Sequence, residues 1–297
     1  MLCLWVFITL CPAVFGQDST IIRLKNWLEE KNFSIQKTFD GSRNENKPAS
    51  IAFQENHRSP NDFFHLDLGI KLSELELLKN TGSSLLFYPK VEWHKSTDST
   101  DLKNKIDGGL NFEFIPFGLK SPDLPGGIPN KGLILAPWIQ GSSSVRRNFI
   151  EDVFEMKLAA QVSLVSNYKF LPGYIFRDKE KNFLARYYPY IGYEYYRLPD
   201  LITKAHTEKF STVFVRLFFD IWIVPRAVQF NLDGTYRRII NNDSAIRTRL
   251  PIMASSIFFY PGRQEVISIG YEYTHGYDTY SKFQLIQLSS LKLSVKI

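Results

Sequence analysis

The chain has very little cysteine: Cys3 and Cys11 are the only two, and both lie within the first sixteen of its 297 residues. If that segment is removed, the rest can form no disulfide and no thiolate metal site, and it has no cysteine nucleophile. A long apolar run is also missing. The longest candidate, Phe210 to Pro225, is interrupted by Arg216 and Asp220, so the sequence predicts no transmembrane helix.

Other signatures are absent as well. There is no glycine-rich phosphate loop, and no spacing of His, Cys, Asp or Glu matches a metal-ligand pattern. The net charge is +6, but Lys and Arg alternate with Asp and Glu and do not gather in a basic patch. We therefore expect no cofactor, no metal ion and no nucleic-acid partner.

The first sixteen residues, Met1 to Gly16, carry no charge and are almost wholly apolar. Val14 and Gly16 are small or modest in size and fit a cleavage site before Gln17. We interpret residues 1–16 as a secretory signal peptide, although the basic residues usual near its start are missing.

Residues 17–47 form a separate N-terminal segment. Its first part has an apolar stripe at helical spacing, formed by Ile21, Leu24, Trp27 and Leu28. This stripe predicts a short amphipathic helix from Thr20 to Lys31, too short to span a membrane and expected to act as a cap or tether. A strand-like piece, Phe33–Phe39, follows the helix and precedes a polar loop.

Residues 48–297 contain twelve stretches in which apolar and polar side chains alternate for roughly ten residues at a time. Phe63–Ser73 is the clearest, because all its aliphatic residues fall on one side of the alternation. A period of two predicts β-strands. The stretches are Pro48–His57, Phe63–Ser73, Ser83–Ser96, Lys105–Phe117, Gly132–Arg147, Asp152–Asn167, Arg186–Leu198, Phe210–Val224, Ala227–Ile240, Arg247–Tyr260, Glu265–Gly276 and Lys282–Ile297.

Strands of about 9–11 residues with one apolar and one polar face are typical of transmembrane β-barrels. A soluble sandwich would show the same alternation with its charges turned outward, but its strands average about 5–6 residues. The aromatic content of 15% also fits the girdles of membrane barrels. We therefore predict an all-β fold, a single antiparallel up-and-down transmembrane β-barrel of about 12 strands over residues 48–297.

An even strand number places both ends of the wall on one side of the membrane, so Phe33–Phe39 is left outside the wall. The tight connections Pro225-Arg226 and Pro261-Gly262-Arg263 would then be periplasmic. Two segments on that same side, Gly118–Lys131 and Tyr168–Ala185, are too long for short turns. They are expected either to fold into the barrel mouth or to mark an error in the strand count.

The polar faces of the strands carry a dense set of charged residues and histidines that we expect to line the lumen. In chain order these are His65, Asp67, Lys71, Lys90, Glu92, His94, Lys105, Asp107, Glu113, Glu155, Lys157, Arg186, Glu194, Arg216, Asp220, Asp233, Arg237, Arg247, Arg249 and Glu272.

Two interpretations of this set remain open. The residues could line a narrow channel and set its ion preference, or they could pair across strands and block flow. A hairpin of Phe63–Ser73 with Ser83–Ser96 would place Asp67 diagonal to Lys90, which makes local pairing easy. The arginines lie on late strands and many acids on earlier ones, which predicts one basic and one acidic wall.

Catalysis is not expected. Lipid-acting enzymes of this architecture need a histidine beside a serine at the lipid-facing wall. His275 falls in that phase, near Thr274, Tyr277 and Ser281, but no serine-centred motif accompanies it.

The tyrosine-rich run Tyr187-Tyr188-Pro189-Tyr190-Ile191-Gly192-Tyr193, with a signal ending at Gly16-Gln17, resembles porin-like outer-membrane barrels of the Bacteroidota. The hydrophobic end at Ile297 is similar to the terminal assembly signal of such proteins, in which Phe is usual. The resemblance implies export to the bacterial outer membrane, contact with its lipid and with the barrel assembly machinery, and no identified protein partner.

These observations favour a narrow porin or channel for small polar solutes or ions. The alternative is a non-conducting structural or assembly-associated outer-membrane protein. A membrane-embedded lipid-modifying enzyme and a secreted soluble β-protein rank below these two.

Overall fold

Twelve antiparallel strands form a closed ring. The computed structural model describes residues 34–36, 49–56, 62–71, 75–76, 84–96, 103–115, 135–150, 152–166, 168–174, 176–177, 183–199, 207–242, 248–261, 267–278 and 283–295. The predicted signal peptide, the predicted helix from Thr20 to Lys31 and the segment Gly118–Lys131 lie outside these residues. Among the described residues, no helix has the length and apolar character needed to cross a membrane.

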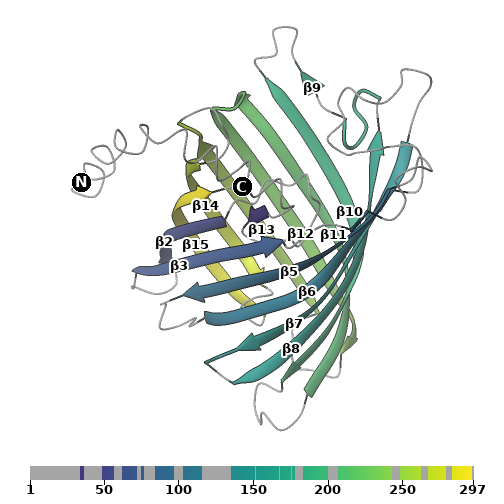
Figure 1. Ribbon diagram of the computed structural model, residues 1–297, viewed down its shortest axis with the longest axis vertical. Helices are drawn as coiled ribbons and strands as arrows, with labels where there is room; N and C mark the ends of the chain where they lie inside the picture. Colours follow the sequence, from purple (N-terminus) through teal and green to yellow (C-terminus); the bar gives the residue numbers. More distant parts are fainter. Residues whose placement is uncertain are drawn as a thin grey trace.

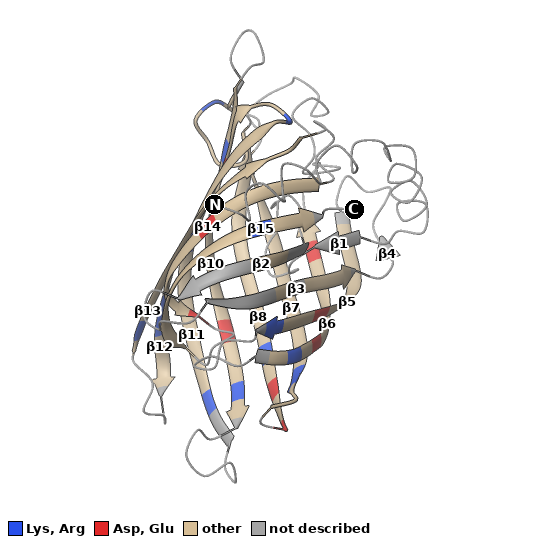
Figure 2. Cartoon of the chain, turned by 90° about the vertical axis from the view of Figure 1, so that its left-hand side faces the viewer, with Lys and Arg blue, Asp and Glu red and all other residues tan. Residues whose placement is uncertain are grey.

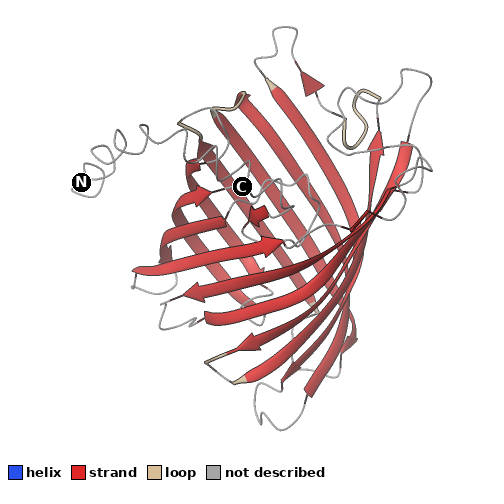
Figure 3. Cartoon of the chain, in the orientation of Figure 1, coloured by secondary structure: helices blue, strands red, loops and turns tan. Residues whose placement is uncertain are grey.

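The strands of the ring match the twelve predicted stretches one for one. They are β2 (Ala49–Asn56), β3 (Asp62–Lys71), β5 (Ser84–Ser96), β6 (Lys103–Ile115), β7 (Leu135–Asn148), β8 (Val153–Ser166), β10 (Leu184–Pro199), β11 (Thr207–Val224), β12 (Val228–Asn242), β13 (Arg249–Phe259), β14 (Ile267–Asp278) and β15 (Gln284–Val295). Each pairs antiparallel with the next, and β15 pairs with β2 to close the wall. Figure 1 shows these first and last strands side by side, and in Figure 3 every regular element of the described chain is a strand.

Three short strands lie outside the ring and extend its edges. They are β1 (Ser34–Gln36), β4 (Leu75–Glu76) and β9 (Phe176–Arg177), which pair with β3, β5 and β10. The piece Phe33–Phe39 was expected outside the wall. Its strand β1 is outside the ring of twelve, yet it bonds to the end of β3, with Ser34 opposite Lys71.

The outer face of the wall is apolar and its inner face is polar, the reverse of a soluble protein. On β5, Trp93 is 37% exposed while its neighbour Glu92 is 0% exposed. The same alternation recurs around the ring, so large apolar side chains cover the outer face. They include Ile51, Leu110, Val145, Phe154, Ile191, Val215, Ile240, Phe259 and Leu291.

This arrangement excludes the soluble sandwich, which would bury its apolar face. Each large apolar side chain gains about 1.5–3 kcal/mol when it leaves water, so an outer face of this kind requires an apolar environment. A closed ring also satisfies the backbone N–H and C=O groups within the wall, as a lipid environment demands. The wall therefore has the physical properties of a membrane-spanning barrel.

Tight turns occur at both ends of the barrel. Between β11 and β12, the Ala227 N–H donates to the Val224 carbonyl at 3.0 Å, and Arg226 has a φ of 59°. Between β7 and β8, at the opposite end, the Ile150 N–H donates to the Asn148 side chain at 3.1 Å. Short turns thus belong to both ends, and the long segment Tyr168–Ala185 needs its own explanation.

That segment builds into the wall and does not alter the strand count. The ladder between β8 and β10 stops at Ser163 and Tyr190. Beyond that point, the Ser166 N–H donates to the Pro172 carbonyl at 2.9 Å and the Gly173 N–H to the Tyr187 carbonyl at 3.0 Å. Together with β9, this loop provides backbone hydrogen-bond partners for the ends of β8 and β10, which do not pair with each other there.

Glycines let aromatic rings of the neighbouring strand lie flat against the wall. Gly192 on β10 is in register with Phe214 on β11, and Gly141 and Gly270 are likewise opposite Phe112 and Phe258. A Cβ at Gly192 would lie 2.3 Å from Phe214 Cζ and 2.7 Å from the Ala160 carbonyl oxygen. The ring covers the space that a side chain would need.

We expect Gly192→Ala to lower the free energy of unfolding by about 1–3 kcal/mol, because the ring and the backbone oxygen would both have to shift. Gly108→Ala is the matched control, since a Cβ there meets nothing within 4 Å. Urea unfolding in lipid vesicles, followed by tryptophan fluorescence, measures both. Equal midpoints for the two variants would contradict the close approach seen at Gly192.

Candidate functional site

The inner face of the barrel gathers the charged residues of alternate strand positions. Of the predicted lumen-lining residues, fifteen have described side chains that lie in this inward-facing phase: Lys90, Glu92, His94, Lys105, Asp107, Glu113, Glu155, Lys157, Arg186, Glu194, Arg216, Asp220, Asp233, Arg237 and Glu272. Figure 2 shows acidic and basic residues interspersed along the strands. His65, Asp67 and Lys71 belong to β3 by backbone, but their side chains, like all of Arg247, lie outside the described residues.

The prediction for Arg249 was wrong. Its side chain is exposed on the outer face, opposite Arg238, while the next residue, Leu250, is 0% exposed. The physical reason is that Leu250 packs in an apolar cluster with Phe210 and Phe283. The apolar residue occupies the inner phase at this end of β13 and turns the arginine outward.

Glu92 is the centre of the charges on β5. Lys90 Nζ donates to Glu92 Oε1 at 3.0 Å, and His94 Nε2 lies 3.4 Å from Glu92 Oε2. All three side chains are almost completely buried. The residues are two apart in sequence, so strand geometry alone brings them onto one face.

A second group joins β6, β7 and β8. Arg146 donates to Asp107 at 3.0 Å and to Glu155 at 3.3 Å, and Lys105 reaches Glu155 at 3.4 Å. Arg146 was not among the predicted residues. The pair Arg146-Arg147 puts one arginine on each face, and only the phase shared with the inward Ser144 identifies which one points inward.

A third group is centred on Glu194 of β10. Arg237 Nε donates to Glu194 Oε2 at 2.8 Å, Lys157 Nζ lies 3.5 Å from Oε1, and the Thr212 hydroxyl donates at 3.2 Å. Lys157 comes from β8 and Arg237 from β12, so the carboxylate joins elements on both sides of its own strand.

The neighbouring acids on β11 and β12 are paired in the same manner. Arg186 Nε donates to Asp220 at 2.7 Å, and Gln229 donates to the other Asp220 oxygen at 2.7 Å. Arg216 forms two bonds to Asp233, at 2.7 and 2.6 Å. Further along the same part of the ring, Lys292 of β15 donates to Glu272 of β14.

These pairs correct the expectation of one basic and one acidic wall. The arginines do lie on late strands, but each has a carboxylate next to it: Arg186 has Asp220, Arg216 has Asp233 and Arg237 has Glu194. Charges of opposite sign therefore alternate along the wall. Every described ion pair of the inner face joins residues of one strand, of neighbouring strands or of next-nearest strands.

The charged part of the interior lies between apolar and aromatic clusters near the two ends. One cluster comprises Ala136, Trp138, Val165, Tyr188, Tyr190, Phe214 and Phe218. Its Trp138 indole donates to Glu113 at 3.2 Å, and the Tyr88 hydroxyl donates to the same carboxyl at 3.1 Å. The cluster therefore anchors its aromatic rings to the polar wall.

A second apolar cluster lies at the opposite end of the barrel. It comprises Tyr196, Leu198, Phe210, Ile239, Leu250 and Phe283. Phe283 stands in the turn before β15, with a φ of 60°, and its ring centroid lies 5.2 Å from that of Tyr196 and 5.3 Å from that of Phe210. Because those rings belong to β10 and β11, the cluster covers the inner wall from β10 to the turn between β14 and β15.

Within the described ranges, no group of three or more His, Cys, Asp or Glu could hold a metal ion. His275 is exposed on the outer face, in the phase that the sequence predicted. What the inner wall offers is a set of buried, mutually compensated charges.

No protein-family model and no curated protein sequence matches the chain. Among solved structures, the NanC porin is similar with a TM-score of 0.46 and 9% identity, over 84% of this chain and 98% of that one. The transport unit of the autotransporter AIDA-I from Escherichia coli gives 0.39 and 8%, over 87% and 94%. The outer membrane channel DcaP of Acinetobacter baumannii gives 0.38 and 10%, over 89% and 96%.

Proposed function

We propose that this protein is a narrow channel for small polar solutes or ions in a bacterial outer membrane. The observation that carries the proposal is the direction of the inner ion pairs. In the described part of the wall they run along its surface, between strands no further apart than next-nearest neighbours. Such pairs compensate the charges without bridging the lumen from one side to the other.

The size of the ring supports the same proposal. Barrels of about 8 strands are filled by their own side chains, while those of 16–18 strands hold open aqueous channels. Twelve strands fall between these limits. A polar inner wall with an apolar cluster around Phe283 at one end then fits a small pore better than a wide diffusion channel.

The alternating charges also bear on selectivity. Because each described arginine of β10, β11 and β12 that faces inward lies beside a carboxylate, a passing ion meets both signs at close range. We therefore expect weak discrimination between small anions and cations, unlike a pore lined by rings of one charge.

One observation favours a second candidate, a non-conducting structural barrel. Lys90, Glu92, His94, Lys105 and Asp107 are all 3% exposed or less. Side chains so well covered on the β5–β6 side leave little water-accessible wall there. Conduction in this protein would then depend on the wall of β12 to β14, where Asp233 and Glu272 are more exposed.

Conductance across a planar lipid bilayer tests the proposal. We expect purified, refolded protein with heat-modifiable gel migration to give discrete current steps and, in a salt gradient, only a small reversal potential. A barrel that shows heat-modifiable migration but never conducts would contradict the channel and favour the structural role. A sample that has failed to refold, and so shows no heat-modifiable migration, controls for non-specific leakage across the bilayer.

A further inference from the structure

Two like-charged residue pairs lie on the outer face of the barrel, at the end opposite the Pro225 turn. Arg238 of β12 is directly opposite Arg249 of β13, and Arg197 of β10 is directly opposite Lys209 of β11. All four side chains are exposed. Directly opposed residues on antiparallel strands have Cβ atoms about 4.5–5.5 Å apart, and like charges at that distance repel.

Nothing in the described chain compensates these charges. None of the four residues forms an ion pair with a described residue, whereas the inward-facing Arg237, next in sequence to Arg238, binds Glu194 at 2.8 Å. Arg147, also exposed at this end, has its own partner in Asp152 at 3.0 Å. Among the residues whose side chains are described, the two opposed pairs therefore have no acid like those beside other arginines of the wall.

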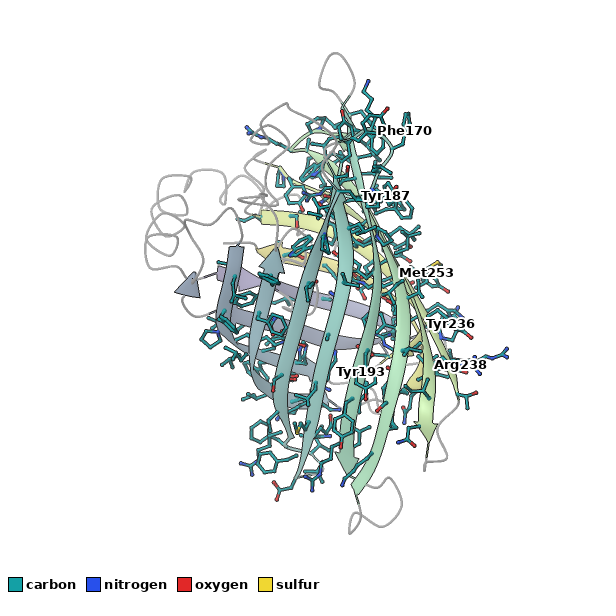
Figure 4. The ribbon with its side chains drawn as sticks, turned by 90° about the vertical axis from the view of Figure 1, so that its right-hand side faces the viewer. Phe170, Tyr187, Tyr193, Tyr236, Arg238 and Met253 are labelled. Carbon is teal, nitrogen blue, oxygen red and sulfur yellow. The ribbon has the colours of Figure 1, made fainter. Side chains whose placement is uncertain are left out.

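The outer face shows at which depth the pairs lie. Along β12 and β13, Met253, then Tyr236, then Arg238 follow each other toward the rim, and Figure 4 shows them in that order on the outside of the wall. Along β10 the order is Ile191, Tyr193 and Arg197. Exposed tyrosines mark the interface of membrane barrels, so the basic pairs lie near it, with the exposed Ile240 following Arg238 toward the rim.

We propose that these two basic pairs bind the phosphate groups of lipid headgroups. A phosphate between two opposed cations would replace their repulsion by charge-assisted hydrogen bonds, and the planar guanidinium of arginine matches phosphate oxygens in a bidentate manner. Arg238 lies one outward-facing position beyond Tyr236 and Arg197 two beyond Tyr193, which is close to the level at which a lipid presents its phosphate. The proposed ligands are lipids whose phosphate is not neutralised by a positively charged choline, and they would bind at this part of the outer wall.

Lipid retention measures the proposal directly. Native mass spectrometry of the detergent-solubilised barrel, with added dioleoyl phosphatidic acid or phosphatidylcholine, should show preferred retention of phosphatidic acid. We expect the double variant Arg238→Gln/Arg249→Gln to bind phosphatidic acid about tenfold more weakly, as the loss of one charge-assisted contact implies. Arg147→Gln is the matched control and should retain phosphatidic acid as the native chain does.

Stability in vesicles gives an independent readout that does not require conduction. In phosphatidylcholine vesicles the double variant should unfold at the same urea concentration as the native chain or a higher one, because a repulsive pair has been removed. Adding phosphatidic acid to the vesicles should raise the midpoint of the native chain more than that of the double variant, which keeps only the pair of Arg197 and Lys209. Unchanged retention in the double variant would overturn the proposal, as would inorganic phosphate binding as tightly as the lipid.

Discussion

Replacing Glu194 by glutamine should lower the free energy of unfolding by about 3–5 kcal/mol, because it breaks a buried ion pair from one side only. Glu194 accepts bonds from Arg237 and Thr212 and lies 3.5 Å from Lys157. With the carboxylate gone, two largely buried cations would remain next to each other. The loss should appear as a lower urea midpoint in vesicles and a lower temperature for loss of heat-modifiable migration.

The matched control for Glu194→Gln is Asp152→Asn. Asp152 also accepts a bond from an arginine, Arg147, but the two side chains are 78% and 47% exposed. Exposed pairs contribute about 0–1 kcal/mol, and asparagine tolerates the φ of 52° at this position. If Glu194→Gln cost no more than Asp152→Asn, the inner charges would be solvated by lumen water and the buried network would be refuted.

A double variant separates the two cations bound to Glu194. Glu194→Gln combined with Arg237→Gln removes one of them, and we expect it to recover part of the stability lost in Glu194→Gln. Strict additivity of the two single losses would mean that Glu194 and Arg237 do not interact.

Phe283→Gly should raise the single-channel conductance on the order of twofold, since a constriction limits a pore whose other walls are unchanged. The ring of Phe283 closes the apolar cluster against Tyr196 and Phe210. Glycine removes the ring and also suits the left-handed backbone of this turn, where φ is 60°. The turn geometry is therefore retained while the mouth is widened.

Two further variants make the test on Phe283 specific. Phe259→Gly removes an equally large ring from the outer face, where Phe259 is 52% exposed, and should leave conductance unchanged. Phe283→Asn keeps the left-handed conformation and puts a polar group into the mouth, so it should also conduct more than the native chain. Equal conductance of all three folded variants would show that this cluster does not limit flow.

The strands could be predicted because each has to satisfy two environments at once. Lys90, Glu92 and His94 alternate with Val91 and Trp93, and when such a pattern continues for ten or more residues it favours a wall between lipid and lumen. The number of wall strands and their approximate positions followed from it, although many strand ends differ by two or three residues. The inward phase of most charged residues followed as well, since it depends only on counting by two.

Register was harder to predict, and the hairpin of Phe63–Ser73 with Ser83–Ser96 shows why. A tight connection would have placed Asp67 diagonal to Lys90, but Asp67 is opposite His94, and Lys90 is opposite Lys71. The connection between β3 and β5 contains the extra strand β4, so no short turn determines the pairing. Ion-pair partners depend on the register between neighbouring strands, and the alternation of polar and apolar residues does not determine that register.

Phase itself failed where local packing competes with polarity. Leu250 and Phe283 pack on the inner face at their end of the barrel. Arg249 therefore points outward, although the strand pattern around it predicted that it would point inward. Arg146 was not predicted as an inward-facing residue, because Arg147 beside it is equally basic and the sequence does not indicate which of the two faces inward. Where two neighbouring residues are both polar, or where an apolar residue belongs inside, a period of two no longer distinguishes the faces.

The bond between β2 and β15 has a consequence for the order of events in the life of the chain. The seam joins the first strand of the ring to its last, with Ile51 opposite Leu293. A wall cannot close around a lumen until translation has produced β15, however early the other strands exist. Until then each finished strand would present either charge to lipid or apolar surface to water, so the polypeptide has to be kept apart from both while the ribosome completes it.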